Sequence, residues 1–122
     1  MVNCRCAGPD IVPGATFDQR FIIPIPAYQV VGGEIIYQQK GEDLLTLEIG
    51  TDATVEEIDY KTCAIVVPFT QGRSLVFEEP YPAECQINLL TVSGARVVTG
   101  VIALSVGTNM NMEIMTGGDG NG

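Results

Sequence analysis

Apolar and polar residues alternate with a period of two along most of this chain, and β-branched residues are common in the alternating segments. In residues 85–89, for example, Cys85, Ile87 and Leu89 fall on one face, whereas Gln86 and Asn88 fall on the other. This alternation is typical of strands with one buried face. No apolar stripe with the 3.6-residue helical period extends beyond two turns. The sequence therefore predicts an all-β fold.

Glycine, proline and acidic residues divide the alternating segments into about six or seven short antiparallel strands. The first, within residues 17–25, should lie at a sheet edge or stop at Pro24, because proline has no amide donor for a ladder. The other expected breaks are a turn at 32–33, a hairpin at 40–43, a loop at 50–59 with a helical turn at 55–57, a crossover at 69–77 and a hairpin at 93–94. Gly100 is expected to mark a bulge or a close backbone contact. Strands of this number and spacing predict an immunoglobulin-like β-sandwich, with a small barrel as the alternative.

The chain has 122 residues, which is the size of one domain. Residues 1–14 contain two cysteines, two prolines and two glycines and are expected to form an N-terminal arm. The sandwich should occupy residues 15–107. Residues 108–122 are methionine-rich and then glycine-rich, so we expect a C-terminal arm and a flexible tail.

Fifteen acidic residues and six basic residues give a net charge of −9, which disfavours binding to nucleic acid. Charged residues make up only 17% of the chain, which suggests that part of its surface is covered by copies of itself or by other proteins. No apolar run is long enough to span a membrane, and the N-terminus lacks the apolar region of a secretory signal. We therefore expect synthesis in a cytosol-like compartment and no membrane partner.

The chain contains no histidine, so histidine-based nucleophilic catalysis cannot be assembled and the commonest metal ligand is missing. The carboxylate pairs Glu42–Asp43, Glu56–Glu57 and Glu78–Glu79 are expected to be solvated surface groups. The glycine–aspartate tail supplies too few ligands for calcium. The sequence predicts no enzyme activity, no cofactor, no metal and no small-molecule substrate.

The four cysteines suggest two kinds of environment. Cys63 and Cys85 lie at inward positions of their strands, where either a disulfide or two buried free thiols would fit, and free thiols are favoured. Cys4 and Cys6 would lie on the N-terminal arm, where they could cross-link neighbouring subunits under oxidising conditions. A zinc site formed by all four thiolates has little support, because the spacing of Cys4 and Cys6 is not that of common zinc knuckles.

The segment Phe69–Phe77, with the strand before it, resembles a "(L)TQ-x-x-(T/S)-L-x-F" pattern found in small structural proteins of tailed bacteriophages. These proteins are related to the N-terminal domain of phage upper-baseplate proteins. Ile35–Gly41 resembles their "Q-x-G" hairpin, and the likeness extends from about residue 14 to residue 115. This chain departs from the pattern in its Gly72–Arg73 pair and its cysteine-rich arm.

The resemblance implies an immunoglobulin-like component of the tail, baseplate or head surface, made in the host bacterial cytoplasm and present in the virion in multiple copies. Its expected partners are other virion proteins and copies of itself, contacted through sheet edges and both arms. The expected partner-binding residues in the arms are Cys4, Arg5, Cys6, Ile11, Val12, Met110, Met112, Ile114 and Met115. The alternative is a module that binds carbohydrate or a cell surface through Tyr28, Tyr60 or Tyr81.

Overall fold

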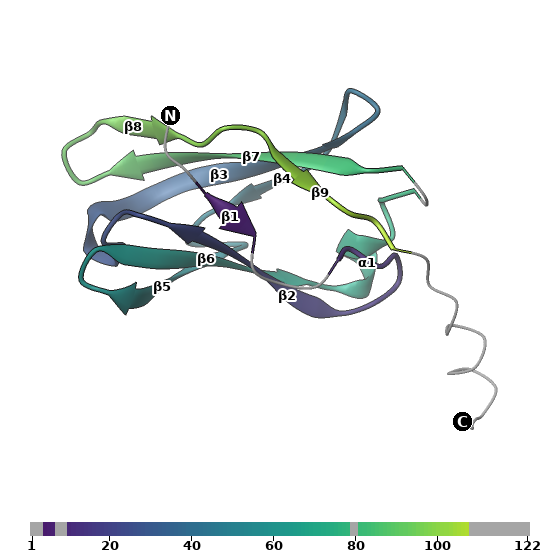
Figure 1. Ribbon diagram of the computed structural model, residues 1–122, viewed down its shortest axis with the longest axis horizontal. Helices are drawn as coiled ribbons and strands as arrows, with labels where there is room; N and C mark the ends of the chain where they lie inside the picture. Colours follow the sequence, from purple (N-terminus) through teal and green to yellow (C-terminus); the bar gives the residue numbers. More distant parts are fainter. Residues whose placement is uncertain (1–3, 7–9, 79–80, 108–122) are drawn as a thin grey trace, which may run out of the picture.

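The computed structural model describes residues 4–6, 10–78 and 81–107, and these form a sandwich of two antiparallel sheets (Figure 1). The strands of the first sheet are β1 (Arg5–Cys6), β2 (Phe17–Ile23), β6 (Thr62–Phe69) and β5 (Thr54–Asp59), in that order. The strands of the second are β4 (Glu42–Glu48), β3 (Val30–Gln39), β7 (Ala83–Thr91) and β8 (Arg96–Val98), and β9 (Ile102–Leu104) also pairs with β7.

This strand order is that of an immunoglobulin-like sandwich, with an A-B-E-D sheet and a C′-C-F-G sheet. The N-terminal segment pairs with two parts of the chain. β1 pairs with β2, and Ile11, which follows β1 in the sequence, forms a parallel bridge with Val106. The N-terminal segment thus contacts both sheets. The all-β, immunoglobulin-like fold predicted from the alternation is confirmed.

Aromatic side chains fill one part of the core between the sheets. The ring of Tyr37 on β3 meets those of Phe69 and Phe77 edge to face, at centroid distances of 5.4 and 5.8 Å. Phe17 stacks on Phe69 at 4.9 Å. The Tyr37 hydroxyl is buried and donates a hydrogen bond of 2.9 Å to Oε1 of Gln19, so both polar groups are satisfied.

Two local predictions are wrong. Gly32 and Gly33 lie inside β3 rather than in a turn. Position 33 requires glycine because β7 passes close to it: a Cβ there would lie 2.1 Å from the carbonyl oxygen of Asn88. Residues 54–59 form the edge strand β5 rather than a helical turn, and exposed carboxylates on such an edge oppose aggregation. The stop predicted at Pro24 is confirmed, because β2 ends at Ile23, although β2 lies between β1 and β6 and is not an edge strand.

Other turns were predicted correctly. Lys40 and Gly41 both have positive φ angles, of 53° and 78°, as a two-residue hairpin turn requires. Gly94 has a φ angle of 87° in the β7–β8 turn. The last predicted strand is interrupted at residues 99–101, which include Gly100, so it becomes β8 and β9.

The boundary predicted at residue 15 is not where the sandwich begins. β1 pairs with β2, and Ile11 is fully buried in the core. Residues 4–6 and 10–14 are therefore part of the packed domain where they are described, because their apolar side chains cover the edge shared by the two sheets. The predicted C-terminal arm, residues 108–122, lies outside the described residues.

Candidate protein-docking surfaces

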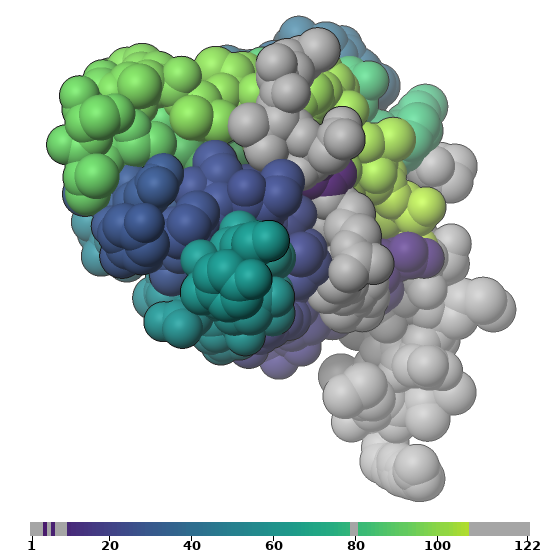
Figure 2. Space-filling model, turned by 60° about the vertical axis from the view of Figure 1, so that its left-hand side comes forward, coloured from purple at the N-terminus to yellow at the C-terminus, as the bar shows by residue number. Residues whose placement is uncertain are grey.

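Three segments far apart in the sequence meet at one end of the sandwich, which we call the loop end: residues 24–31, 57–62 and 91–96. They contain the 3-10 turn η1 (Ala27–Gln29), the β5–β6 turn and the β7–β8 turn. Figure 2 shows this end turned forward, with the green β7–β8 turn, the blue η1 segment and the teal β5–β6 turn side by side. η1 also lies against both β5 and β6.

Backbone hydrogen bonds hold the loop end together. The amide of Val92 donates to the carbonyl of Gln29 at 2.9 Å, which joins the β7–β8 turn to η1. Within that turn, the Thr91 hydroxyl donates to the carbonyl of Ala95 at 2.9 Å. The side chains carried by η1 and the β7–β8 turn are therefore presented on hydrogen-bonded backbone.

The loop end exposes apolar and aromatic side chains. Tyr28 and Tyr60 are 73% and 75% exposed, and Val31, Ile58 and Val92 are also exposed. The ammonium of Lys61 lies 5.2 Å from the centre of the Tyr60 ring. An apolar group on a folded surface indicates a contact surface when its members gather in one place rather than singly.

The loop end carries no net charge, although the whole chain carries −9. Its two carboxylates, Glu57 and Asp59, are balanced by Lys61 and Arg96. Because the remaining surface carries all of the net negative charge, this end can approach another acidic protein with the least repulsion.

The opposite end is built around the single helical turn α1 (Gln71–Ser74). The Thr70 hydroxyl caps α1 by accepting a hydrogen bond from the amide of Arg73. The guanidinium of Arg73 in turn donates to the Pro68 carbonyl at 2.8 Å and to a carboxylate oxygen of Asp52 at 3.2 Å. Leu75 and Val76, which follow α1, are exposed.

Buried side-chain amides and hydroxyls anchor this end further. The fully buried Ser74 hydroxyl accepts from the amide of Gly14 at 2.9 Å and lies 2.9 Å from the carbonyl of Ala15. The side chain of Gln39 donates to the carbonyls of Glu78 and Tyr81 and accepts from the amide of Glu78. Most polar side chains here serve internal hydrogen bonds.

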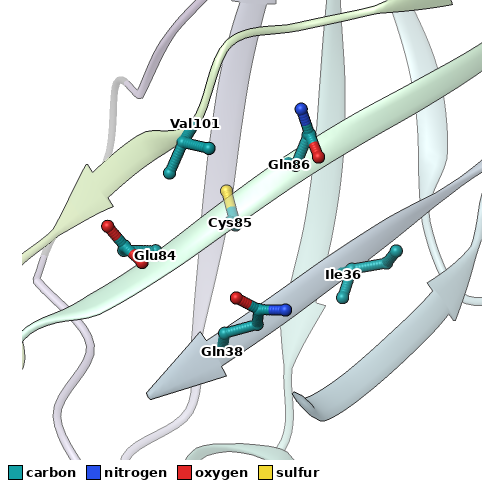
Figure 3. A pocket seen from close by; sticks show the side chains of 6 residues that line it. All are labelled: Ile36, Gln38, Glu84, Cys85, Gln86 and Val101. Carbon is teal, nitrogen blue, oxygen red and sulfur yellow. The ribbon is translucent and has the colours of Figure 1, made fainter. Parts of the chain in front are cut away.

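A small hollow lies on the outer face of the second sheet, where β8 ends and β9 begins (Figure 3). Its volume is about 70 Å³, far below the roughly 300–1,000 Å³ of small-molecule sites. It is large enough for only one side chain of a partner. The residues that line it are Ile36, Gln38, Glu84, Cys85, Gln86 and Val101.

The predicted carboxylate pairs are on the surface where they are described. Glu56 accepts a hydrogen bond from Arg20, and this bond, followed by the charge of Arg20, lowers the pKa of the Glu56 carboxyl. Glu78 forms an ion pair with Lys40 at 3.0 Å. Within residues 4–6, 10–78 and 81–107, no group of three or more cysteines and acidic residues could hold a metal ion.

The predicted partner-binding residues differ in how exposed they are in the structure. Ile11 cannot contact a partner, because it is fully buried, and Val12 is half-buried. Cys4 and Cys6 are half-buried against the core rather than displayed on a free arm. The side chain of Arg5 and the residues Met110, Met112, Ile114 and Met115 lie outside the described part of the chain.

Cys63 and Cys85 are buried free thiols on opposite sheets, which is the favoured one of the two predicted states. The nearby thiols that raise the pKa of Cys85, after burial itself, are Cys4 and Cys6 rather than Cys63. The position of β1 beside β2 could not be deduced from its two residues.

Sequence reasoning found only part of the loop end. Tyr28 and Tyr60 were named as candidate sugar-binding residues, and they lie at the same end, whereas Tyr81 lies at the opposite end. Val31, Ile58 and Val92 were missed. In the sequence, each of these residues is only an apolar residue beside a predicted turn or loop. Such a residue is weak evidence for a binding surface unless the fold is known to bring the turns together.

No helix among the described residues has the length and apolar character needed to cross a membrane.

No family model matches the chain, and no curated protein matches it. The chain is similar to one from a structure on T cell specificity and activation by the bacterial superantigen toxic shock syndrome toxin-1, with 8% identity and a TM-score of 0.42. That match covers 87% of this chain and 99% of the other. Murine CRIg matches with 11% identity and a TM-score of 0.40, over 86% of this chain and 98% of that chain. At such low identities and TM-scores these likenesses carry no argument about function, so the immunoglobulin-like assignment rests on strand order and register.

Proposed function

We propose that this protein is a non-enzymatic structural component of a tailed-phage virion, in the tail, baseplate or head surface. It docks in multiple copies onto other virion proteins through the loop end. The observation that carries the proposal is the group of exposed apolar side chains that three separate segments bring to one end without net charge: Tyr28, Val31, Ile58, Tyr60 and Val92.

The physical character of the loop end suits a protein contact. Interfaces are enriched in aromatic residues, and tyrosine is among the commonest residues that dominate binding energy. The loop end combines two exposed tyrosines with two acidic and two basic residues whose charges balance. The fixed backbone of η1 and the β7–β8 turn also reduces the entropy lost on binding.

The placement in a phage particle is supported by the resemblance of residues 69–77 and their surroundings to small phage structural proteins. The structure gives these residues physical roles: Thr70 caps α1, Ser74 is buried and hydrogen-bonded, and Phe77 packs on Tyr37. Leu75 is exposed, so its side chain has no such role in the core.

The test is light scattering of the purified protein, alone and mixed with each of the other structural proteins of its particle. A trimer, a hexamer or a stoichiometric complex with a virion protein is the expected result. A monomer that binds none of these proteins would overturn the proposal.

Carbohydrate binding is the second candidate, because Tyr28 and Tyr60 are exposed aromatic rings at the same end. Binding to a glycan array that is lost in Tyr28→Ala and Tyr60→Ala, but retained in Tyr81→Ala, would favour it over protein docking.

A further inference from the structure

The segment that follows the described sandwich has the sequence alternation of one further strand. In residues 109–114 a side chain with an amide or a carboxylate alternates with an apolar one, in the order Asn109, Met110, Asn111, Met112, Glu113 and Ile114. No glycine or proline interrupts this segment. A period of two is typical of a strand that buries one face, so the sequence predicts a strand that needs a sheet edge beside it.

The sandwich has two free edges long enough to receive such a strand. Within the described residues, β4 of the second sheet and β5 of the first have a neighbouring strand on one side only, and they contain seven and six residues. The other strands at the sides of the sheets, β1, β8 and β9, contain at most three residues. An added strand gains hydrogen bonds from the unpaired backbone of an edge. The choice is therefore between β4 and β5.

The charges of the two edges favour β4. β5 carries three carboxylates within its six residues, whereas residues 44–47 of β4 are uncharged. Like charges directly opposite each other on paired strands are destabilising, and the alternating segment itself carries Glu113. On β4, Leu45 lies opposite the buried Tyr37 but is itself only half-buried. β4 therefore has apolar surface that an added strand would cover.

The hydrogen-bond register leaves a donor and an acceptor of β4 unpaired. The amide of Ile49 donates to the carbonyl of Gly33 at 2.9 Å, and alternate residues of an antiparallel strand bond to the same neighbour. Thr46, three residues earlier, therefore directs its amide and carbonyl away from β3. Glu48 points the same way, but its amide already donates to the side chain of Asp52 at 2.9 Å. Thr46 is thus the point at which β4 can receive a strand.

The end of the described chain lies far from this point. Gly107 is the last described residue, and its amide donates to the carbonyl of Ile11 at 2.7 Å, just beyond β9. β9 and β4 are on opposite sides of the second sheet, three strand spacings or about 14 Å apart. The three residues from Gly107 to Met110 span at most about 11 Å, and a path around the sandwich is longer than the direct one. The β4 edge of the same chain is therefore out of reach of Met110.

The nearer edge, just beyond β9, is already paired. The amide of Ile11 donates to the carbonyl of Ser105 at 3.0 Å, and the Ile11 carbonyl accepts from Gly107. The N-terminal segment thus occupies the place that a strand folding back from Gly107 would need. A free edge for residues 109–115 is available on another molecule.

We propose that residues 109–115 of one copy add as a strand to the β4 edge of a second copy, where Met110, Met112 and Ile114 cover the half-buried Leu45. Each copy carries both the donor segment and the acceptor edge, so the contact is head-to-tail and the copies form a ring or a longer chain. The inference rests on the proposed function only for the presence of several copies side by side, and it uses a surface separate from the loop end.

The first test is the solution mass of the full-length Tyr28→Ala/Tyr60→Ala variant, measured by light scattering over a range of protein concentrations. This variant lacks both exposed rings of the loop end, so a failure of docking through the loop end does not affect the result. We expect a mass of two or more chains. A monomer at every concentration would overturn the inference, whatever the loop end binds.

Two further variants in the same background test the alternating pattern. Replacing Met110, Met112 and Ile114 by serine should weaken association by at least about 100-fold, because three apolar side chains lose their contact with the acceptor edge. Replacing Asn109 and Asn111 by serine changes the opposite face and should leave association within about threefold of the parent. Equal effects of the two sets of substitutions, or no effect of the first set, would overturn the inference.

Variants of Thr46 test the acceptor edge, with circular dichroism to check folding. Thr46→Pro removes the outward amide, which an edge strand tolerates, and should give a monomer, whereas Thr46→Val keeps the amide and should associate as the parent does. If Thr46→Pro fails to fold, the serine variants of the donor segment decide the question.

A mixture of two monomeric variants tests the head-to-tail arrangement. Thr46→Pro retains the donor segment, and the variant with serine at Met110, Met112 and Ile114 retains the acceptor edge. Equal amounts of the two should form a dimer with one copy of each. Absence of this dimer when both variants are folded, or association of Thr46→Pro alone, would overturn the inference.

Discussion

The two ends of the sandwich use their side chains in opposite ways. At the α1 end, Ser74, Gln39 and Arg73 direct their polar groups inward to hold loops in place. At the loop end, the loops are joined mainly through backbone and short hydroxyl contacts, and the large side chains of Tyr28 and Tyr60 face solvent. One end therefore stabilises the fold, whereas the other has side chains available for a partner.

Removing an aromatic ring from the core at the α1 end should have the largest effect. Phe69 is 2% exposed and contacts the rings of Phe17, Tyr37 and Phe77. Phe69→Ala should lower the free energy of unfolding by about 3–5 kcal/mol, because it leaves a cavity in the aromatic cluster. Urea denaturation followed by circular dichroism measures this change, and a loss below about 1 kcal/mol would contradict the packing described here.

Two serines, one at each end, test the same comparison with one chemical change. Ser74→Ala should cost about 2–3 kcal/mol of unfolding free energy, because the buried Ser74 hydroxyl is lost and the half-buried amide of Gly14 loses its acceptor. Ser93→Ala, in the exposed β7–β8 turn, should cost less than about 1 kcal/mol. Equal losses for the two variants, measured by thermal or urea unfolding, would show that the ends are not specialised in this way.

Tyrosine variants at the loop end should separate binding from stability. Tyr28→Ala and Tyr60→Ala should each weaken the complex with the virion partner by about tenfold or more, as expected for central interface tyrosines. Each should change the unfolding free energy by no more than about 0.5 kcal/mol, because both rings are exposed. Isothermal calorimetry and thermal unfolding measure the two quantities; a large loss of stability with unchanged affinity would reverse the assignment.

The ion pair of Arg20 and Glu56 lies on the outer face of the first sheet, away from both ends, and should give the smallest effect. Its hydrogen bond lowers the pKa of Glu56 below the ordinary value of 4.5. The stabilisation is therefore present above that ordinary value and is lost as the pH falls through the lower, folded-state pKa. Glu56→Gln should remove this small acid dependence, and added salt should weaken it in the native protein. An unchanged stability–pH profile in Glu56→Gln would contradict this role.

The sequence was sufficient for the fold class and for most strands, because alternation and turn chemistry are local. Cys63, Ile65 and Val67 face the core as their spacing predicts. The sequence was not sufficient to place Gly33 in a strand, because the reason for glycine at this position is the Asn88 carbonyl on another strand. β5 was missed because the carboxylates that suit an exposed edge strand also suit a loop.

The candidate docking surface was harder to predict than the fold. Tyr28, Tyr60 and Val92 belong to three turns, and only the tertiary structure places these turns at one end. The position of β1 was equally hard to predict, since a strand of two residues has too short an alternation pattern to identify its partner strand. Exposure and three-dimensional proximity were the missing information in both cases.

The most direct test of the docking claim is the dissociation constant of the complex between this protein and its virion partner, measured for the wild type and two variants. The double variant Tyr28→Ala/Tyr60→Ala alters the loop end, and Tyr81→Ala makes the same change at the opposite end. We predict that the double variant weakens binding by about 100-fold, whereas Tyr81→Ala stays within about threefold of the wild type. Wild-type affinity in the double variant, or a loss confined to Tyr81→Ala, would contradict the assignment of docking to the loop end.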